Sequence, residues 1–219
     1  MRQRGVKNRE QIIEDCSEYL VRGPREMKGK WNSPESGLWN AESLEYPLFL
    51  EIGSGKGQFI SNIAERCSKG RFLACEGGQN IFIRILQKAA AKDQRNLRVI
   101  SEYIIEPLEY FEPGELKGIY INFCDPWPKD GHAHRRLTHR NKLLAYQKLL
   151  TPGGFLQFKT DNDALFEWSL EEFKVCGLTP SIVERDLWHS PYEEGNLHTE
   201  YEEKFAGSGK TINLARIDF

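Results

Sequence analysis

Short apolar runs alternate with longer amphipathic patterns from Pro47 onward, and this alternation limits the folds that the chain can adopt. Strand-like runs occupy residues 48–52, 71–76, 97–101, 118–123 and 155–160. Helical patterns occupy residues 58–67, 80–93, 106–112, 137–150 and 161–176. Strand–helix alternation of this kind predicts an α/β fold, with a doubly wound, mostly parallel sheet covered by helices on both faces.

Beyond residue 176 the helical patterns give way to successive strand-like runs. They are SIVERDLW, TEYEEKF and TINLARIDF, and they predict a C-terminal antiparallel hairpin at one edge of the sheet. The stretch AGSGKT at 206–211 resembles the end of a phosphate-binding loop, but Lys204 stands where that motif needs its first glycine. We therefore expect a hairpin turn at 206–211.

The first 46 residues differ from the remainder of the chain. They combine many basic residues with isolated tryptophans and turn formers, and one short helix is expected near residues 8–20. The predicted organisation is an N-terminal extension over 1–46 and one domain over 47–219. The N-terminus lacks the apolar core of a signal peptide, which favours a cytoplasmic protein.

Net charge and cysteine usage exclude several classes of protein. The formal net charge is −2, so affinity for nucleic acid requires a local basic patch. The five cysteines are scattered and none forms a C-x-x-C pair, which favours reduced thiols over a disulfide framework or a zinc site.

A glycine-rich loop follows the first predicted strand, in LEIGSGKGQF at 50–59. The third glycine comes one residue too early for the dinucleotide fingerprint, and no Ser or Thr follows Lys56 as a phosphate loop would require. An acid before the loop, Glu51, and a second acid ending the next strand, Glu76, suit a ligand with a ribose and positive charge. This pattern favours S-adenosylmethionine, held by Gly53, Gly55, Gly57 and the two acids, over a dinucleotide or ATP.

The run INFCDPWPKDGHAHRRLTH places an acid and an indole at the end of a predicted strand. Asp125 should lie beside the cofactor's methyl group, with Pro126 and Pro128 restricting the backbone around Trp127. The following segment 129–142 holds five Lys or Arg residues against one acid, and we expect these cations to grip phosphates, although a solvated face is the alternative.

Two other chemistries are disfavoured for this segment. The spacing of its three histidines matches no familiar metal site, so no metal is expected. Cys124 has no base beside it in the sequence, so we expect it to pack against the sheet and not to act as a nucleophile.

Five stretches together resemble the bacterial tRNA (guanine-N7-)-methyltransferase family, a group of Rossmann-like enzymes that use S-adenosylmethionine. They are LEIGSGKGQF, INFCDPWPK, HAHRRLT, FKTDN and TEYEEKF, in this order and spacing. The resemblance covers roughly residues 47–219. It implies transfer of a methyl group to N7 of a guanine in the tRNA variable loop, by a monomer or homodimer that acts on tRNA and not at a membrane.

The resemblance also implies roles for individual residues. Glu51 and Glu76 match the family's cofactor contacts, and Asp125 matches its central active-site acid. The positions that match substrate contacts are Lys129, Asp161, Thr199, Glu200, Tyr201 and Glu202. For Asp161, a helix N-cap is an equally economical interpretation.

Two positions depart from the family's pattern. Tyr103 stands where the family commonly has an acid near the adenine ring, so stacking by Tyr103 or contact with the neighbouring Glu102 must replace that acid. Asp130 and Gly131 occupy positions where cations are common, which weakens the expected grip on tRNA. The rival functions are adenine-N6 methylation, an RNA-binding module without catalysis and, least favoured, a dehydrogenase.

Overall fold

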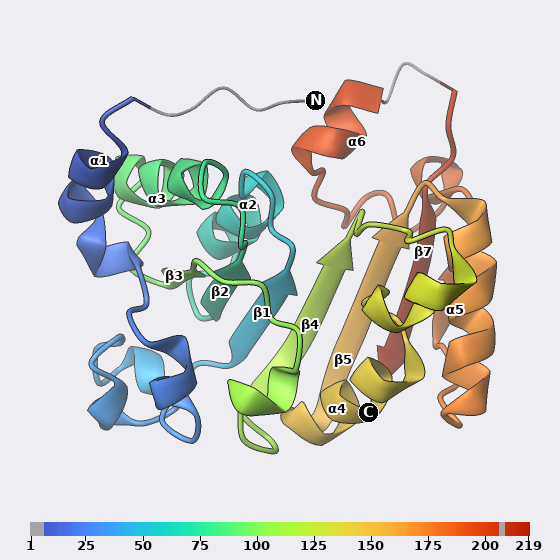
Figure 1. Ribbon diagram of the computed structural model, residues 1–219, viewed down its shortest axis with the longest axis horizontal. Helices are drawn as coiled ribbons and strands as arrows, with labels where there is room; N and C mark the ends of the chain where they lie inside the picture. The colour runs from blue at the N-terminus through green and yellow to red at the C-terminus, as the bar shows by residue number, and fades with distance from the viewer. Residues whose placement is uncertain (1–6, 206–208) are drawn as a thin grey trace.

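A seven-stranded sheet forms the centre of the computed structural model, which describes residues 7–205 and 209–219 (Figure 1). Its strands are β1 (Leu48–Ile52), β2 (Arg71–Cys75), β3 (Leu97–Ile100), β4 (Leu116–Asn122), β5 (Leu150–Thr160), β6 (Ile182–Glu184) and β7 (Asn213–Asp218). The strand order is β3-β2-β1-β4-β5-β7-β6. Strands β1 to β5 run parallel, whereas β7 is antiparallel to both β5 and β6. The predicted α/β class, with a mostly parallel sheet and an antiparallel C-terminal pair, is confirmed.

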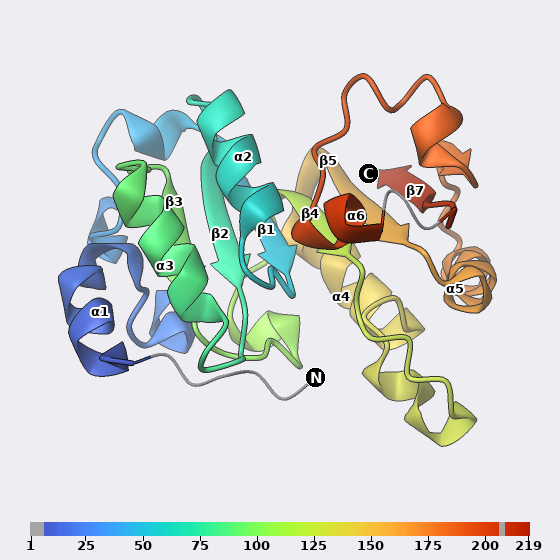
Figure 2. The same cartoon turned by 90° about the horizontal axis from the view of Figure 1, so that it is seen from above.

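Helices cover both faces of this sheet. They are α1 (Arg9–Asp15), α2 (Gln58–Arg66), α3 (Phe82–Ala91), α4 (Arg140–Leu149), α5 (Asp163–Val175) and α6 (Glu200–Phe205). Figure 2 shows α1, α2 and α3 grouped at the β1–β3 half, α4 and α5 at the other half, and α6 near the ends of β4 and β5. Within the described ranges, no helix has the length and apolar character needed to cross a membrane.

Alternation along the buried strands divides the apolar side chains between two packing layers. In β2, Phe72 and Ala74 pack with α1, α2 and α3, whereas Leu73 and Cys75 join the layer that contains α4 and α5. All four side chains are buried. This is the pattern expected of a central parallel strand, because both of its faces are covered.

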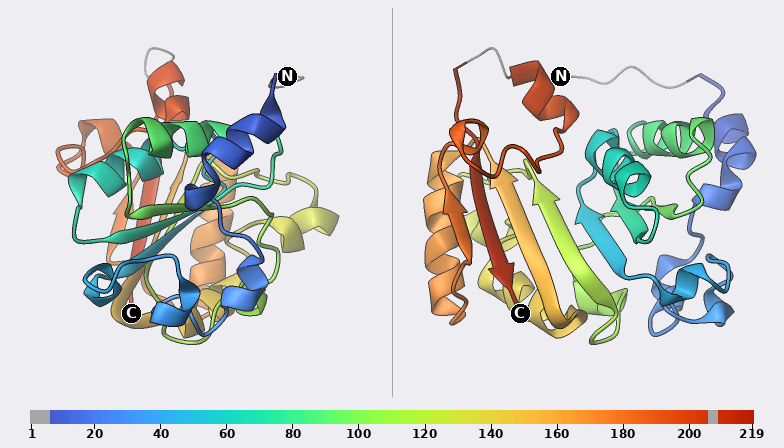
Figure 3. Two further views of the ribbon diagram at one scale, coloured as in Figure 1. Left: turned by 90° about the vertical axis from the view of Figure 1, so that its left-hand side faces the viewer. Right: turned by 180° about the vertical axis from the view of Figure 1, so that it is seen from behind.

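In the N-terminal segment before β1, α1 lies beside α3, and much of the stretch between α1 and β1 lies at the end of the sheet opposite α6 (Figure 3). Trp31 is fully buried, stacks on Phe111 with ring centroids 5.2 Å apart, and donates its indole N–H to the Tyr110 carbonyl at 2.8 Å. Arg71, at the start of β2, donates to the Trp31 carbonyl and to the Asn32 side chain. The segment therefore contributes side chains to the main core. The boundary at residue 46 stays a prediction.

Three expectations for local structure were wrong. In the strand expected at 199–205, residues 200–205 instead form helix α6, because Thr199 and Glu202 make a reciprocal capping box: each accepts a hydrogen bond from the other's backbone N–H. The segment near 106–112 forms only a short 3₁₀ helix, Pro107–Glu109. The antiparallel strands β6 and β7 are joined by a long connection that contains α6, whereas a further strand was expected between them. The turn predicted at 206–211 lies partly outside the described residues.

Replacing Trp31 tests whether the N-terminal segment belongs to the core. Trp31→Ala should lower the free energy of unfolding by about 3–5 kcal/mol, the usual range for a buried tryptophan. Chemical denaturation measures the change, with Tyr192→Ala as the control because Tyr192 is 43% exposed. A Trp31→Ala protein as stable as the control would show that this segment adds little to the core.

Candidate active site

The carboxyl ends of the neighbouring parallel strands bring together the acids singled out in the sequence. Strand β1 pairs with β2 on one side and β4 on the other, and β4 pairs with β5. Glu51 lies near the end of β1, Glu76 directly follows β2, Asp125 follows β4, and Asp161 directly follows β5. In an open parallel sheet, this edge near the β1/β4 switch point is where ligands bind.

The glycine loop between β1 and α2 has a backbone that favours glycine. Gly53, Gly55 and Gly57 have φ values of 80°, 54° and 77°. A Cβ atom at Gly55 would meet nothing within 4 Å, whereas one at Gly57 would lie 2.8 Å from the Ile85 side chain. Gly57 thus allows α2 to pack closely on α3, and Gly55 leaves the space beside it open for a ligand.

Glu76 links the glycine loop to the chain that follows β2. Its two carboxylate oxygens accept the backbone N–H of Gly55 at 3.0 Å and that of Gly78 at 2.7 Å. Burial raises the pKa of Glu76, and the nearby negative charge of Asp125 adds to the rise. Glu76 and Asp125 therefore act on one another electrostatically, which agrees with their predicted placement in one site.

Glu51, in β1 just before the loop, is almost fully buried. One of its oxygens accepts the Asn122 side-chain N–H at 2.8 Å, and the other has no hydrogen-bond partner in the described part of the chain. Burial raises the pKa of Glu51 to about 7 from its ordinary value of 4.5. Asn122 was not identified from the sequence, although a polar residue inside the apolar run GIYINF was a usable signal.

The stretch from Phe123 to Pro128, which contains Asp125, carries unusual backbone conformations. Phe123 and Trp127 have φ values of 53° and 41°, which cost about 1–3 kcal/mol each for side chains of this size. The buried Arg136 stabilises this conformation by donating to the carbonyls of Pro126 and Trp127. The Asp125 side chain itself is exposed.

The basic segment 129–142 is less available to phosphates than its composition indicated. Arg136 is buried against Trp168, Lys142 is buried and donates to the Ile105 carbonyl, and Arg140 pairs with Glu172 at 2.6 Å. The expectation that all five cations face RNA was therefore wrong. Lys129 is exposed, and Arg135 is exposed with its guanidinium 4.8 Å from the centre of the Trp127 ring.

The histidines and Cys124 of this region have structural surroundings. The rings of His132 and Trp127 form a T-shaped pair, and His139 caps α4 by accepting the Asn141 backbone N–H. Over residues 7–205 and 209–219, no group of three or more His, Cys, Asp or Glu side chains is arranged to hold a metal ion. Burial raises the pKa of Cys124 to about 12, so the thiol stays protonated and unreactive at neutral pH.

Tyr103 and Glu102, the two candidates for the adenine contact, point to different partners. Glu102 accepts the Tyr110 hydroxyl at 2.8 Å and pairs with Arg25 at 2.9 Å. Tyr103 is 68% exposed, and its ring lies so close to Gly77 that an added Cβ there would be 2.3 Å from it. The structure therefore favours stacking by Tyr103 over a contact with Glu102.

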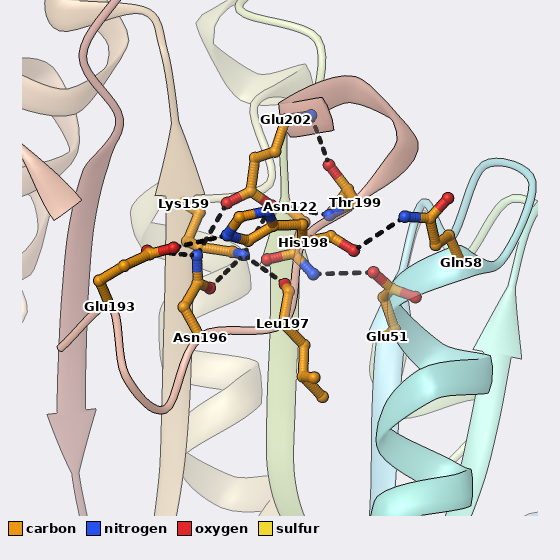
Figure 4. Close-up of polar contacts among 10 residues, drawn as sticks. All are labelled: Glu51, Gln58, Asn122, Lys159, Glu193, Asn196, Leu197, His198, Thr199 and Glu202. Atoms are coloured by element: carbon orange, nitrogen blue, oxygen red, sulfur yellow. Dashed lines mark hydrogen bonds and ion pairs between the residues drawn. The ribbon is translucent and has the colours of Figure 1, made fainter. Parts of the chain in front are cut away.

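The segment predicted to bind substrate, 199–202, is held by a buried cation (Figure 4). Lys159, in β5, donates to the carboxylate of Glu202 at 2.9 Å, and both side chains are fully buried. Thr199 is also buried. Glu200 accepts the Gln58 backbone N–H at the start of α2 and pairs with Lys88 of α3.

Asp161 contacts the same C-terminal region and does not cap α5. Its carboxylate accepts the Tyr201 hydroxyl at 3.0 Å and pairs with Lys210 at 2.7 Å. The N-cap of α5 is Asn162, whose side-chain oxygen accepts the Leu165 N–H at 2.8 Å. The N-cap interpretation of Asp161 was therefore wrong by one residue.

Sequence comparison places relatives of named activity beside this chain. A family model described as "Putative methyltransferase" matches residues 45–215. The chain is 35% identical to a tRNA (guanine-N(7)-)-methyltransferase of Bacillus subtilis (strain 168), over 100% of this chain and 99% of the relative. It is 40% identical to a protein of the same name from Limosilactobacillus reuteri (strain DSM 20016), over 97% and 96% of the two chains.

Comparison with solved structures supports the fold. The 16S rRNA methyltransferase KamB is similar with a TM-score of 0.58 and 14% identity, over 80% of this chain and 89% of KamB. The geranyl diphosphate C-methyltransferase of Streptomyces coelicolor A3(2), solved in complex with S-adenosyl-L-homocysteine among other ligands, has a TM-score of 0.51 and 15% identity. That likeness covers 78% of this chain and 69% of the Streptomyces chain.

The raised pKa of Glu51 predicts how stability depends on pH. Between pH 4.5 and about 7, the folded protein keeps a proton on Glu51 that the unfolded chain has released. The free energy of unfolding should therefore fall as pH rises through this interval, by about 3 kcal/mol from this group. Glu51→Gln removes the contribution, so denaturation from pH 4.5 to 7.5 should show a wild-type decline that is steeper than the variant's. Parallel profiles for the two proteins would contradict the assignment.

Proposed function

The chain belongs to the bacterial tRNA (guanine-N7-)-methyltransferase family, and from this we propose that it methylates N7 of a guanine in the tRNA variable loop. Family membership follows from the family match over 45–215 and from relatives of 35–40% identity over nearly the whole chain. Methyl transfer from S-adenosylmethionine to guanine N7 of tRNA is the activity of this family. The variable loop, a cytoplasmic location and a monomeric or homodimeric state stay predictions.

One observation carries the proposal at the level of the site. The glycine loop after β1, the acid after β2 and Asp125 after β4 lie at the ends of three adjacent parallel strands. The pKa of Glu76 responds to the charge of Asp125 and to the backbone N–H of Gly55, so these parts share one environment. A methyl donor held by the loop and Glu76 would thus lie beside the exposed carboxylate of Asp125.

The residues present fit the cofactor. The carboxylate of Glu76, directed toward the glycine loop, suits the two hydroxyls of a ribose, and the unpartnered oxygen of Glu51 suits a positively charged donor. We assign cofactor binding to Glu51, Gly53, Gly55, Gly57, Glu76, Tyr103 and Asp125. S-adenosylmethionine, when bound, supplies an activated methyl group on a sulfonium.

The reaction requires alignment and electrostatic stabilisation and no general base. Guanine N7 carries a free lone pair, which forms the new N–C bond as the C–S bond breaks and the sulfur becomes neutral. The purine gains a positive charge, so a fixed carboxylate nearby lowers the barrier. We assign this role to Asp125, or the role of accepting hydrogen bonds from guanine N1–H and the exocyclic amino group, or both.

The substrate contacts are divided among exposed and buried residues. Lys129 is exposed, four residues after Asp125 in the sequence, and suits a phosphate of the tRNA backbone. Glu200 and Tyr201 belong to α6, and Asp161 accepts the Tyr201 hydroxyl; we assign these three residues to substrate binding. Thr199 and Glu202 belong to the same segment, but their contacts lie within the protein, so they serve the substrate by holding α6.

The nucleoside produced tests the proposed function. Purified protein, labelled S-adenosylmethionine and unmodified tRNA should yield 7-methylguanosine after digestion to nucleosides. Labelled 6-methyladenosine would favour the adenine-N6 activity that the Asp-Pro-Trp-Pro motif also resembles. Absence of any labelled nucleoside would favour an RNA-binding module without catalysis.

Removing the carboxylate of Asp125 should slow the chemical step. Asp125→Ala should lower the single-turnover rate of methyl transfer about 10²–10³-fold, as expected for the loss of one preorganised electrostatic group. Calorimetry should show that S-adenosylmethionine still binds the variant. A variant with normal turnover would exclude Asp125 as the central active-site residue.

Tyr103 should matter through its ring and not its hydroxyl. Tyr103→Ala should weaken S-adenosylmethionine binding about 5- to 30-fold, which is the range expected for the loss of one aromatic–base stack. Tyr103→Phe is the matched control and should bind as wild type does. Equal affinity of all three proteins, measured by calorimetry, would show that adenine is held elsewhere.

A further inference from the structure

A polar layer crosses three neighbouring strands next to the cofactor loop. Glu51 of β1 is hydrogen bonded to Asn122 of β4, and Asn122 lies directly opposite Lys159 of β5 in the strand register. The positive charge of Lys159 also acts on Glu51. A fully buried lysine requires full compensation, because an unpaired charge in the interior is strongly unfavourable.

Every hydrogen-bond acceptor that the structure gives the Lys159 ammonium comes from one segment, residues 196–202 (Figure 4). The acceptors are the Asn196 side chain at 3.0 Å, the Leu197 carbonyl at 3.1 Å and the Glu202 carboxylate at 2.9 Å. Glu202 accepts two further hydrogen bonds from the same segment, the Thr199 backbone N–H and the Asn196 side-chain amide. The charge pair thus fixes both the approach to α6 and its first turn.

Two other residues of α6, Glu200 and Tyr201, reach the start of α2 and the end of β5. Glu200 contacts the first backbone N–H of α2 and Lys88 of α3. Tyr201 donates to Asp161, and its ring centroid lies 4.9 Å from that of Phe123. The placement of Glu200 and Tyr201 therefore depends on what holds the base of the helix.

We propose that Lys159 is a positioning residue for tRNA, which acts by holding α6 over the ends of β4 and β5 so that Glu200 and Tyr201 meet the substrate. The inference rests on the proposed function and adds to it a residue whose side chain is fully buried and cannot touch tRNA itself. A buried ion pair contributes little net stability compared with an apolar pair of similar size, so its main effect here is a single position for α6. Without Lys159, residues 196–202 and α6 would have to become ordered when tRNA binds, and this ordering would lower the affinity for tRNA.

A double variant separates positioning from stability. Lys159→Met with Glu202→Leu removes both charges and leaves no unpaired ion, so the fold should persist. The KM for tRNA should rise about 30-fold, because the segment must then be ordered on binding. The Kd for S-adenosylmethionine should change much less, since the cofactor loses only the influence of the Lys159 charge on Glu51. Amide hydrogen exchange over 199–205 should become faster in the protein alone.

The matched control removes another buried polar pair, which lies outside the segment 196–202. Thr138→Val with Ser169→Ala deletes hydroxyls that lie 2.7 Å apart, both fully buried, and should leave KM for tRNA and exchange over 199–205 as in wild type. Asn196→Ala keeps the ion pair. It should also raise KM for tRNA more than Kd for S-adenosylmethionine, but by a smaller factor than the double variant. It serves as the test if the double variant does not fold.

Two results would overturn the proposal. One is a wild-type KM for tRNA in variants whose α6 exchanges faster, and the other is an equal loss of affinity for tRNA and S-adenosylmethionine. If wild-type protein forms no methylated nucleoside, the proposed function fails on that result alone. Hydrogen exchange would still decide whether Lys159 holds α6.

Discussion

Parallel pairing of β1 with both β2 and β4 is the constraint on which the site depends. Parallel strands present their carboxyl ends at one edge, so residues far apart in the sequence are brought together without contacts designed for each pair. Glu51, Glu76 and Asp125 derive their common location from this register alone. The sheet thus determines where the site lies. The loop glycines, the Asp-Pro-Trp-Pro segment and α6 then determine its local shape.

The same edge concentrates groups that a stable core would avoid. Glu51 is buried with one unpartnered oxygen, Lys159 is buried as an ion pair, and Phe123 and Trp127 adopt positive φ values. Each of these features lowers stability, and each is held in place by contacts nearby, such as those of Asn122, Glu202 and Arg136. Local strain and buried charge of this kind are typical of functional sites, where the surrounding fold compensates for them.

Periodicity and glycine spacing were enough to predict the sheet, the loop after β1 and the strand-end acids. These predictions failed where specific hydrogen bonds and ion pairs outweigh the preference that the residue pattern indicates. Residues 199–205 were expected to form a strand, but the Thr199–Glu202 capping box and the charge of Lys159 favour a helix. That cation lies 43 residues before Glu202 in the chain. Likewise, the basic segment 129–142 contains the predicted charges, but Glu172 and the Ile105 carbonyl, which engage Arg140 and Lys142, come from other parts of the sequence.

The central claim is that the ends of β1, β2 and β4 form a site for S-adenosylmethionine that exists before tRNA binds. Calorimetric titration of the purified wild-type chain with S-adenosylmethionine, in the absence of RNA, tests this claim most directly. The account predicts binding of one molecule per chain, because the glycine loop, Glu51 and Glu76 are already in place. Absence of binding heat over the micromolar to millimolar range would contradict it and leave the chain as an RNA-binding relative of the enzymes it resembles.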